Sequence, residues 1–205
     1  MGVYQDQLLP RFQDLVMRRK ATREPRARVC AGLYGEVVEV GFGTGLNAAY
    51  YPAEVEKVWA VEPSTLCMRL AQPRIARTSA RVESAGLNGE HLELPSGEFD
   101  GVLSTWTLCT IPDAAGALAE LRRVLKGGGS LHFIEHGHAP DAKVARWQGR
   151  LEPLQKRLAG GCHLTRDIPK MIADAGFAIE HLDTYYLEGE PKVFGYTFEG
   201  RAVKA

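Results

Sequence analysis

The sequence lacks a long apolar run, an excess of either charge and a cysteine motif. Its N-terminal residues hold no apolar stretch of signal-peptide or membrane-spanning length, so we expect a cytoplasmic protein without a membrane anchor. The 25 basic side chains balance 25 acidic ones, which removes the global field that attracts nucleic acid or an anionic membrane. The four cysteines show no C-x-x-C spacing, so neither a disulfide framework nor a metal site is predicted.

The length of 205 residues fits one domain with a sizeable core. We expect an N-terminal helical segment over residues 1–34 and a core over residues 35–205. The helical segment carries a basic run, made of Arg18, Arg19, Lys20, Arg23, Arg26 and Arg28. Such a run either steers an anionic substrate to a site that the segment covers or forms a solvated helix face.

A glycine-rich turn follows the first buried apolar run. Gly41, Gly43 and Gly45 give the spacing G-x-G-x-G, and Leu46 stands where the last glycine of a dinucleotide-binding G-x-G-x-x-G would fall. A second apolar run ends on Glu62, and a carboxylate at that place accepts hydrogen bonds from ribose hydroxyls. The two runs therefore predict a nucleoside-binding βαβ unit that is not of the dinucleotide type.

Strand and helix patterns alternate along the chain after residue 35. We expect strands at residues 37–40, 58–61, 81–85, within 97–105 and at 131–134, and helices at 46–51, 63–76, 114–125, 142–158 and 168–175. The glycines at 127–129 are expected to end the helix before them. Two last extended runs, at 179–187 and 193–203, have a hairpin-like connection. The pattern predicts an α/β fold with a doubly wound, mostly parallel sheet that a C-terminal antiparallel hairpin completes.

The glycine loop and the acid before it, Glu39, resemble motif I of the class I S-adenosylmethionine (SAM) methyltransferases. Residues 92–100 and 120–129 resemble, in the same order, segments of the methyltransferase type 11 domain. A narrower resemblance, to the small methyltransferase-like subfamily that includes alkyl-thiol methyltransferases, rests on residues 41–47 and 50–52, Leu-Cys-Thr at 108–110, Glu-His at 135–136 and Gly-Cys-His-Leu-Thr-Arg at 161–166. It implies a seven-stranded, Rossmann-like fold, SAM as cofactor and S-adenosylhomocysteine as product.

The resemblance places the cofactor at the ends of the first four strands. Glu62 is expected to hold the ribose, and Glu39 and Thr105 are expected near the methionine part of SAM. Residues 88–90 align with the adenine loop of the family, where Asn88 replaces the usual aspartate. The predicted SAM-binding residues are Glu39, Gly41, Gly43, Gly45, Glu62, Pro63, Asn88, Gly89, Glu90 and Thr105.

The candidate catalytic residues follow the fifth strand and the Gly-Cys-His motif. We predict His136 as a general base, with Glu135 orienting it or binding the acceptor, and His163 as the second candidate. The alternative is that Glu135 and His136 serve structural hydrogen bonds at a strand end. No metal ligands are predicted, because adjacent residues on an extended chain point to opposite faces.

These observations predict a SAM-dependent methyltransferase for a small molecule, with a hydroxyl of a sugar, polyol or small metabolite as the acceptor. S-methylation of a small thiol is the alternative, since a thiol with a pKa of about 8.5 supplies thiolate without a strong base. A non-catalytic SAM-binding subunit is a third. Nucleic acid is disfavoured, because residues 104–107 read Ser-Thr-Trp-Thr instead of Asn/Asp-Pro-Pro-aromatic. We expect a monomer or a homodimer.

Overall fold

One seven-stranded sheet organises the computed structural model, which describes residues 4–86 and 88–204 and so leaves out the first three residues of the predicted helical segment. The strands are β1 (Gly35–Val40), β2 (Val55–Val61), β3 (Arg81–Ser84), β4 (Phe99–Thr105), β5 (Leu125–His136), β6 (Phe177–Tyr186) and β7 (Tyr196–Lys204). Their order is β3-β2-β1-β4-β5-β7-β6. The strands from β3 to β5 are parallel, and β7 is antiparallel to both β5 and β6. The predicted fold class is confirmed.

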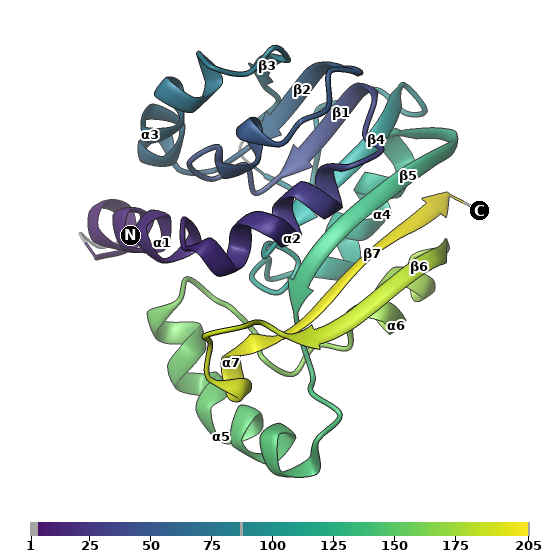
Figure 1. The fold of residues 1–205 in the computed structure, drawn as a ribbon. Coiled ribbons are helices and arrows are strands. Elements are labelled where there is room, and N and C mark those ends of the chain that lie inside the picture. Colours follow the sequence, from purple (N-terminus) through teal and green to yellow (C-terminus); the bar gives the residue numbers. More distant parts are fainter. Residues whose placement is uncertain (1–3, 87, 205) are drawn as a thin grey trace.

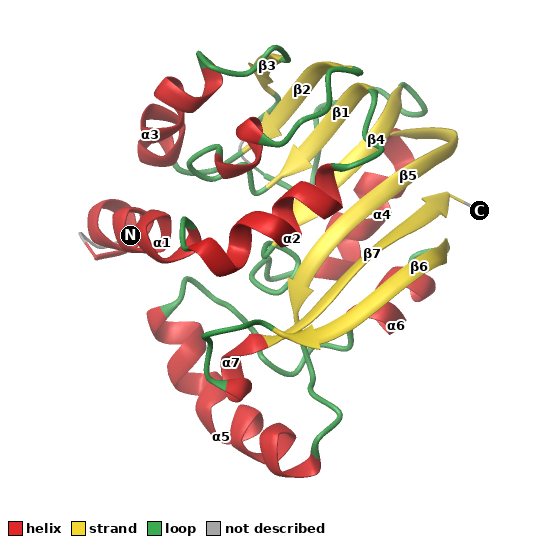
Figure 2. Cartoon of the chain, viewed as in Figure 1, coloured by secondary structure: helices red, strands yellow, loops and turns green. Residues whose placement is uncertain are grey.

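Helices cover both faces of the sheet. They are η1 (Tyr4–Leu8), α1 (Leu9–Met17), α2 (Lys20–Cys30), the short η2 (Leu46–Ala49), α3 (Thr65–Ile75), α4 (Ala114–Val124), α5 (Ala142–Leu158), α6 (Ile168–Asp174) and the single turn α7 (Lys192–Gly195). Figure 1 shows α2 in front of the sheet and α4 and α6 behind it, and Figure 2 separates the same layers by type of structure. Such coverage is typical of parallel sheets, whose strands are apolar on both faces.

The strand β1 illustrates why its apolar run is continuous. Val37 packs into a core cluster that includes Val29 of α2, whereas Val38 packs into the opposite cluster, which includes Leu118 of α4. Successive side chains of a strand point to opposite faces, so both positions must be apolar. Glu39 interrupts this run as a buried carboxylate near the carboxyl end of the strand.

The glycines at 127–129 do not end α4, contrary to the prediction. The helix stops at Val124, and Leu125 already pairs with Phe99 of β4 as the first residue of β5. The next pair is Gly101 with Ser130, so the residues between Leu125 and Ser130 form an outward bulge. Glycine suits a helix end and a bulge equally well, and the early pairing of Leu125 with β4 decides between them.

Further boundaries differ from the prediction, and two of them lie near the end of the sheet that carries the site. The strand β5 runs on through Glu135 and His136, two residues beyond its expected end. The first residues of the last extended run form α7, and β7 starts only at Tyr196. Within residues 4–86 and 88–204, no helix has both the length and the apolar content needed to cross a membrane.

Candidate functional site

The glycine loop folds over the end of β2 and binds its terminal acid. Gly41, Gly43 and Gly45 all have positive φ angles, of 69°, 56° and 73°. Gly41 needs to be glycine for space as well, because a Cβ atom there would overlap the Thr107 side chain. The Gly43 N–H donates to Oε2 of Glu62 over 2.8 Å. The structure therefore brings together the two halves of the predicted nucleoside motif.

Glu62 is a buried carboxylate at the carboxyl edge of the sheet, followed by the exposed Pro63. Its Oε1 accepts a hydrogen bond from the Ser64 N–H over 2.8 Å, as its Oε2 does from Gly43. Burial raises the pKa of Glu62, and these two amides act in the opposite direction. Each carboxylate oxygen has a second lone pair, so Glu62 can still accept from two vicinal ribose hydroxyls.

Glu39 is the centre of a buried polar network. The Asn47 side-chain amide donates to Oε1 of Glu39 over 3.0 Å, and the Tyr51 hydroxyl donates to Oε2. The same amide lies 3.0 Å from Oγ1 of Thr105, which joins the ends of β1 and β4. Burial raises the pKa of Glu39 to about 7. The two predicted residues Glu39 and Thr105 are thus connected through Asn47.

Arg26 was not predicted as a site residue, yet its guanidinium completes this network. The side chain is only 5% exposed and donates through Nη1 to Oδ1 of Asn47 over 2.6 Å and to Thr105 over 3.3 Å. Its Cζ lies 4.8 Å from the centre of the Trp106 ring. Burial lowers the pKa of Arg26 to about 10. The spacing of the buried α2 residues Thr22, Arg26, Val29 and Cys30 is the signal that places this arginine on the inner helix face.

Two buried donors at this place have no hydrogen-bond partner among the described residues, Nε of Arg26 and Nε1 of Trp106. Buried donors are nearly always paired, so this pair points to an acceptor that the protein itself does not supply. An anionic carboxylate, such as the one on the methionine part of SAM, fits them. Trp106 also has a positive φ of 52°, a strained backbone for a large residue that is typical of functional sites. The other members of the basic run are exposed, as the solvated-surface interpretation expects.

The N-terminal segment is attached to the glycine loop. The Thr44 hydroxyl donates to Oδ1 of Asp14 on α1 over 2.6 Å. Nη1 of Arg74 on α3 lies 2.9 Å from the same oxygen and donates to the Thr44 carbonyl over 2.7 Å. The helix α1 therefore borders the predicted cofactor pocket.

The predicted adenine loop packs against the end of β1. The Glu90 N–H donates to Oδ1 of Asn88 over 2.8 Å, and Oε1 of Glu90 accepts from the Asp113 N–H over 2.9 Å. A Cβ atom on Gly89 would come within 2.7 Å of Val40, so the backbone of this loop lies directly on the strand. The contact of this loop with adenine stays a prediction.

Glu135 is fully buried and holds the loop after β4. Its Oε1 accepts from the Ser104 hydroxyl over 2.7 Å and from the N–H groups of Thr107 and Leu108 over 3.0 Å. Its Oε2 accepts from the Cys109 N–H over 3.1 Å. Burial raises the pKa of Glu135. The loop donors, not the imidazole of His136, occupy both oxygens, which matches the structural alternative kept open for this carboxylate.

His136 points instead toward two cysteines. One ligand atom from each of Cys109, His136 and Cys162 lies within 4.8 Å of the other two, and the two Sγ atoms are 3.7 Å apart. Contact with the Cys109 thiol, helped by His136, lowers the pKa of Cys162, whereas contact with Cys162 and burial raise the pKa of Cys109. The His136 ring also meets the Trp106 ring edge to face, with 6.2 Å between centroids.

This cluster was missed because its members are far apart in the sequence. Cys109 and Cys162 are 53 residues apart and belong to no spacing that indicates metal binding. The available signal was that Leu-Cys-Thr, Glu-His and Gly-Cys-His all belong to the segments of the narrower resemblance. His163 joins the cluster only through its backbone, whose N–H donates to the Cys109 carbonyl over 2.7 Å. Its Nδ1 lies 3.5 Å from Glu152 of α5, and burial lowers the pKa of His163.

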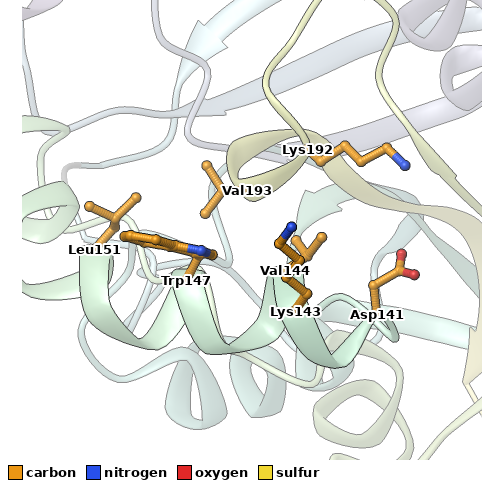
Figure 3. A pocket seen from close by; sticks show the side chains of 7 residues that line it. All are labelled: Asp141, Lys143, Val144, Trp147, Leu151, Lys192 and Val193. Carbon is orange, nitrogen blue, oxygen red and sulfur yellow. The ribbon is translucent and has the colours of Figure 1, made fainter.

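A separate groove of about 490 Å³ lies between α5 and α7 (Figure 3). It is lined by Asp141, Lys143, Val144, Trp147, Leu151, Lys192 and Val193. None of these seven residues is a predicted site residue, so the chemistry is not assigned to this groove.

Comparison with known proteins agrees with this geometry. The sequence matches the methyltransferase domain family over residues 38–133. Thiol S-methyltransferase TMT1B from Rattus norvegicus is 35% identical over 179 residues, which cover 82% of this chain and 70% of that protein. Thiol S-methyltransferase TMT1A from Homo sapiens is 28% identical over 206 residues, which cover 95% of this chain and 80% of that protein.

Among solved structures, a SAM-dependent methyltransferase from Thermotoga maritima is similar with a TM-score of 0.70. The two sequences are 22% identical, and the similarity covers 99% of this chain and 98% of the other. At that identity the likeness supports the fold alone.

Proposed function

Because the chain belongs to the family of SAM-dependent methyltransferases, with SAM as its cofactor, we propose that it methylates the sulfur of a small thiol. The sequence favoured a hydroxyl as the acceptor and gave a small thiol as the alternative, and the thiol is the acceptor proposed here. The observation that carries the proposal is the position of His136, whose ring lies beside two cysteines and, among residues 4–86 and 88–204, is in no ion pair with a carboxylate.

The reactivity of the two acceptors explains why that position matters. A hydroxyl must lose its proton during attack, so it needs a well-oriented general base, and Glu135 is committed to the loop after β4. A thiol ionises near neutral pH and needs mainly to be held in line with the methyl group. Relatives named as thiol S-methyltransferases, aligned over most of the chain, support the same acceptor.

The cofactor roles follow from the two polar centres. We assign the ribose hydroxyls to Glu62, and the methionine carboxylate to the unpaired Nε of Arg26 and Nε1 of Trp106. Glu39 positions Asn47, which in turn holds Arg26 and Thr105. Bound SAM supplies an electrophilic methyl group on a sulfonium. When an acceptor sulfur forms the new carbon–sulfur bond to this methyl group, the rest of SAM leaves as S-adenosylhomocysteine.

The test is the release of S-adenosylhomocysteine by the purified protein with matched panels of small alkyl thiols and of the corresponding alcohols. We expect turnover with thiols, accompanied by formation of the methyl thioether, and none with alcohols. Glu62→Ala is the control variant, since it should weaken cofactor binding and reduce turnover with every acceptor. Turnover with alcohols alone would contradict the proposal, and S-adenosylhomocysteine binding without any turnover would favour the non-catalytic subunit.

A further inference from the structure

We propose that Cys109, His136 and Cys162 form a zinc site whose fourth position binds the acceptor thiol. The zinc site itself stands on the geometry of these three side chains, and the role of the fourth position rests on the proposed thiol methylation. Nothing in the sequence spacing indicates such a site.

Three separate elements bring the ligands together. Cys109 lies in the loop after β4, His136 is the last residue of β5, and Cys162 lies in the loop after α5. Two thiolates on a tetrahedral zinc ion, each about 2.3 Å from the metal, are about 3.8 Å apart. The observed distance between the two Sγ atoms is 3.7 Å, and a ligand nitrogen of His136 is within 4.8 Å of both. The sulfur pair therefore already has the separation that zinc requires.

The types of ligand select the metal and its role. Soft thiolates with one imidazole favour zinc over the oxygen-preferring magnesium and calcium ions. Structural zinc sites use four protein ligands, whereas catalytic sites use three and keep one position for water or substrate. Among residues 4–86 and 88–204, Cys109, His136 and Cys162 are the ligand group found here, so a set of three with one open position is the catalytic pattern.

The backbone around Cys109 is fixed on both sides. Its N–H donates to Glu135 over 3.1 Å, and its carbonyl accepts from the His163 N–H over 2.7 Å. The neighbouring N–H of Leu108 is held by the same carboxylate. Such support keeps a ligand side chain in place before the metal binds. Buried Glu135 therefore has a specific role in the proposed site, which is to hold the backbone that carries the zinc ligand Cys109.

The cluster adjoins the proposed cofactor pocket through one aromatic ring. Trp106 contacts His136 on the side of the cluster and Arg26 on the side of the pocket, at 6.2 Å between rings and 4.8 Å from ring to guanidinium. Cys109 is 1% exposed and Cys162 is 6% exposed, while His136 is only partly buried. An acceptor therefore reaches the ion past the histidine, next to the methyl donor.

The chemistry is balanced without an oxidant or reductant. A thiol that binds the ion gives up its proton to solvent and stays bound as thiolate. Its sulfur lone pair then forms the bond to the methyl carbon while the bond from that carbon to the sulfonium breaks. The products are a neutral methyl thioether, which is a weaker ligand, and S-adenosylhomocysteine.

The experiment measures bound metal directly. The full chain is purified with a phosphine reductant, which keeps both thiols reduced, and its zinc content is determined by mass spectrometry. We expect about one zinc per chain, and a Co(II)-substituted protein with the thiolate charge-transfer bands of a tetrahedral site. In Cys162→Ser and Cys109→Ser, zinc affinity should fall more than about a hundredfold, since even outer-shell changes lower it 10- to 100-fold. The matched control Cys67→Ser changes a buried cysteine of α3 outside the cluster and should keep its zinc.

Two readouts keep the outcomes apart. Binding of S-adenosylhomocysteine, measured by calorimetry, reports whether each variant is folded. Reduced wild-type protein that binds S-adenosylhomocysteine but neither zinc nor Co(II) overturns the zinc site, even if thiols are methylated. Zinc held by the two cysteines without any thiol turnover leaves the zinc site in place and overturns the proposed function.

Discussion

Replacing Glu135 by glutamine tests whether this carboxylate holds the loop after β4. Its four donors are the Ser104 hydroxyl and the N–H groups of Thr107, Leu108 and Cys109. Glutamine keeps one oxygen, which can still accept the three bonds now made by Oε1. Its amide nitrogen would face the Cys109 N–H, donor against donor.

The magnitude follows from those contacts. One buried donor left unpaired costs about 1–3 kcal/mol, and the three retained bonds lose their charge assistance, about 0.5–1 kcal/mol each. We therefore expect Glu135→Gln to lower the free energy of unfolding by about 4 kcal/mol. Urea denaturation followed by circular dichroism measures this change.

Glu93→Gln is the matched control, because Glu93 is exposed and should shift stability by less than about 0.5 kcal/mol. If Glu135→Gln changes the unfolding free energy by less than about 1 kcal/mol, the loop-holding role is refuted. A stable variant with normal S-adenosylhomocysteine binding but a collapsed kcat would instead favour the role predicted from the sequence, in which Glu135 acts on His136.

Two further predictions concern the cofactor pocket. Gly41→Ala places a Cβ atom on a backbone with a left-handed conformation, where it would clash with the Thr107 side chain. Calorimetry should therefore show more than about tenfold weaker binding of S-adenosylhomocysteine. The control is Gly127→Ala, which has open space around its Cβ atom and should bind S-adenosylhomocysteine normally. The folded pKa of Glu39, raised to about 7 from 4.5, adds stability below pH 4.5 that is lost as the pH rises to 7. The unfolding free energy of the wild type minus that of Glu39→Gln should therefore fall by about 3 kcal/mol between pH 4.5 and pH 8, and a pH-independent difference would contradict it.

The parts of the fold that the sequence predicted well depend on local patterns. The first strand is predicted from its continuous apolar run, and its glycine loop from backbone conformations that only glycine adopts easily. The acid Glu62 is predicted from its place at the end of the second apolar run. The helix at 142–158 was predicted with its observed bounds, because its pattern meets no competing signal. The glycines at 127–129 satisfy two local rules, for a helix end and for a bulge, and only the pairing of Leu125 with β4 selects the bulge.

The site was harder to predict because its contacts are long-range. The arginine at position 26 resembles the other cations of the basic run. Helical spacing places it on the inner face of α2, but only its hydrogen bonds to η2 and β4 reveal the network that it belongs to. Cys109 and Cys162 meet only because the sheet sets the end of β4 beside the loop after α5. The sequence around either cysteine does not indicate that their sulfur atoms lie close together.

The position of β7 between β5 and β6 has a consequence for the biosynthesis of this protein. Residues 177–186 of β6 are made before residues 196–204 of β7, yet β6 pairs only with β7 in the finished sheet. Until β7 leaves the ribosome, β5 has an open edge and β6 has no neighbour, and unpaired strand edges promote aggregation. The nascent chain is therefore most exposed to aggregation after β6 has been made and before β7 can pair with it.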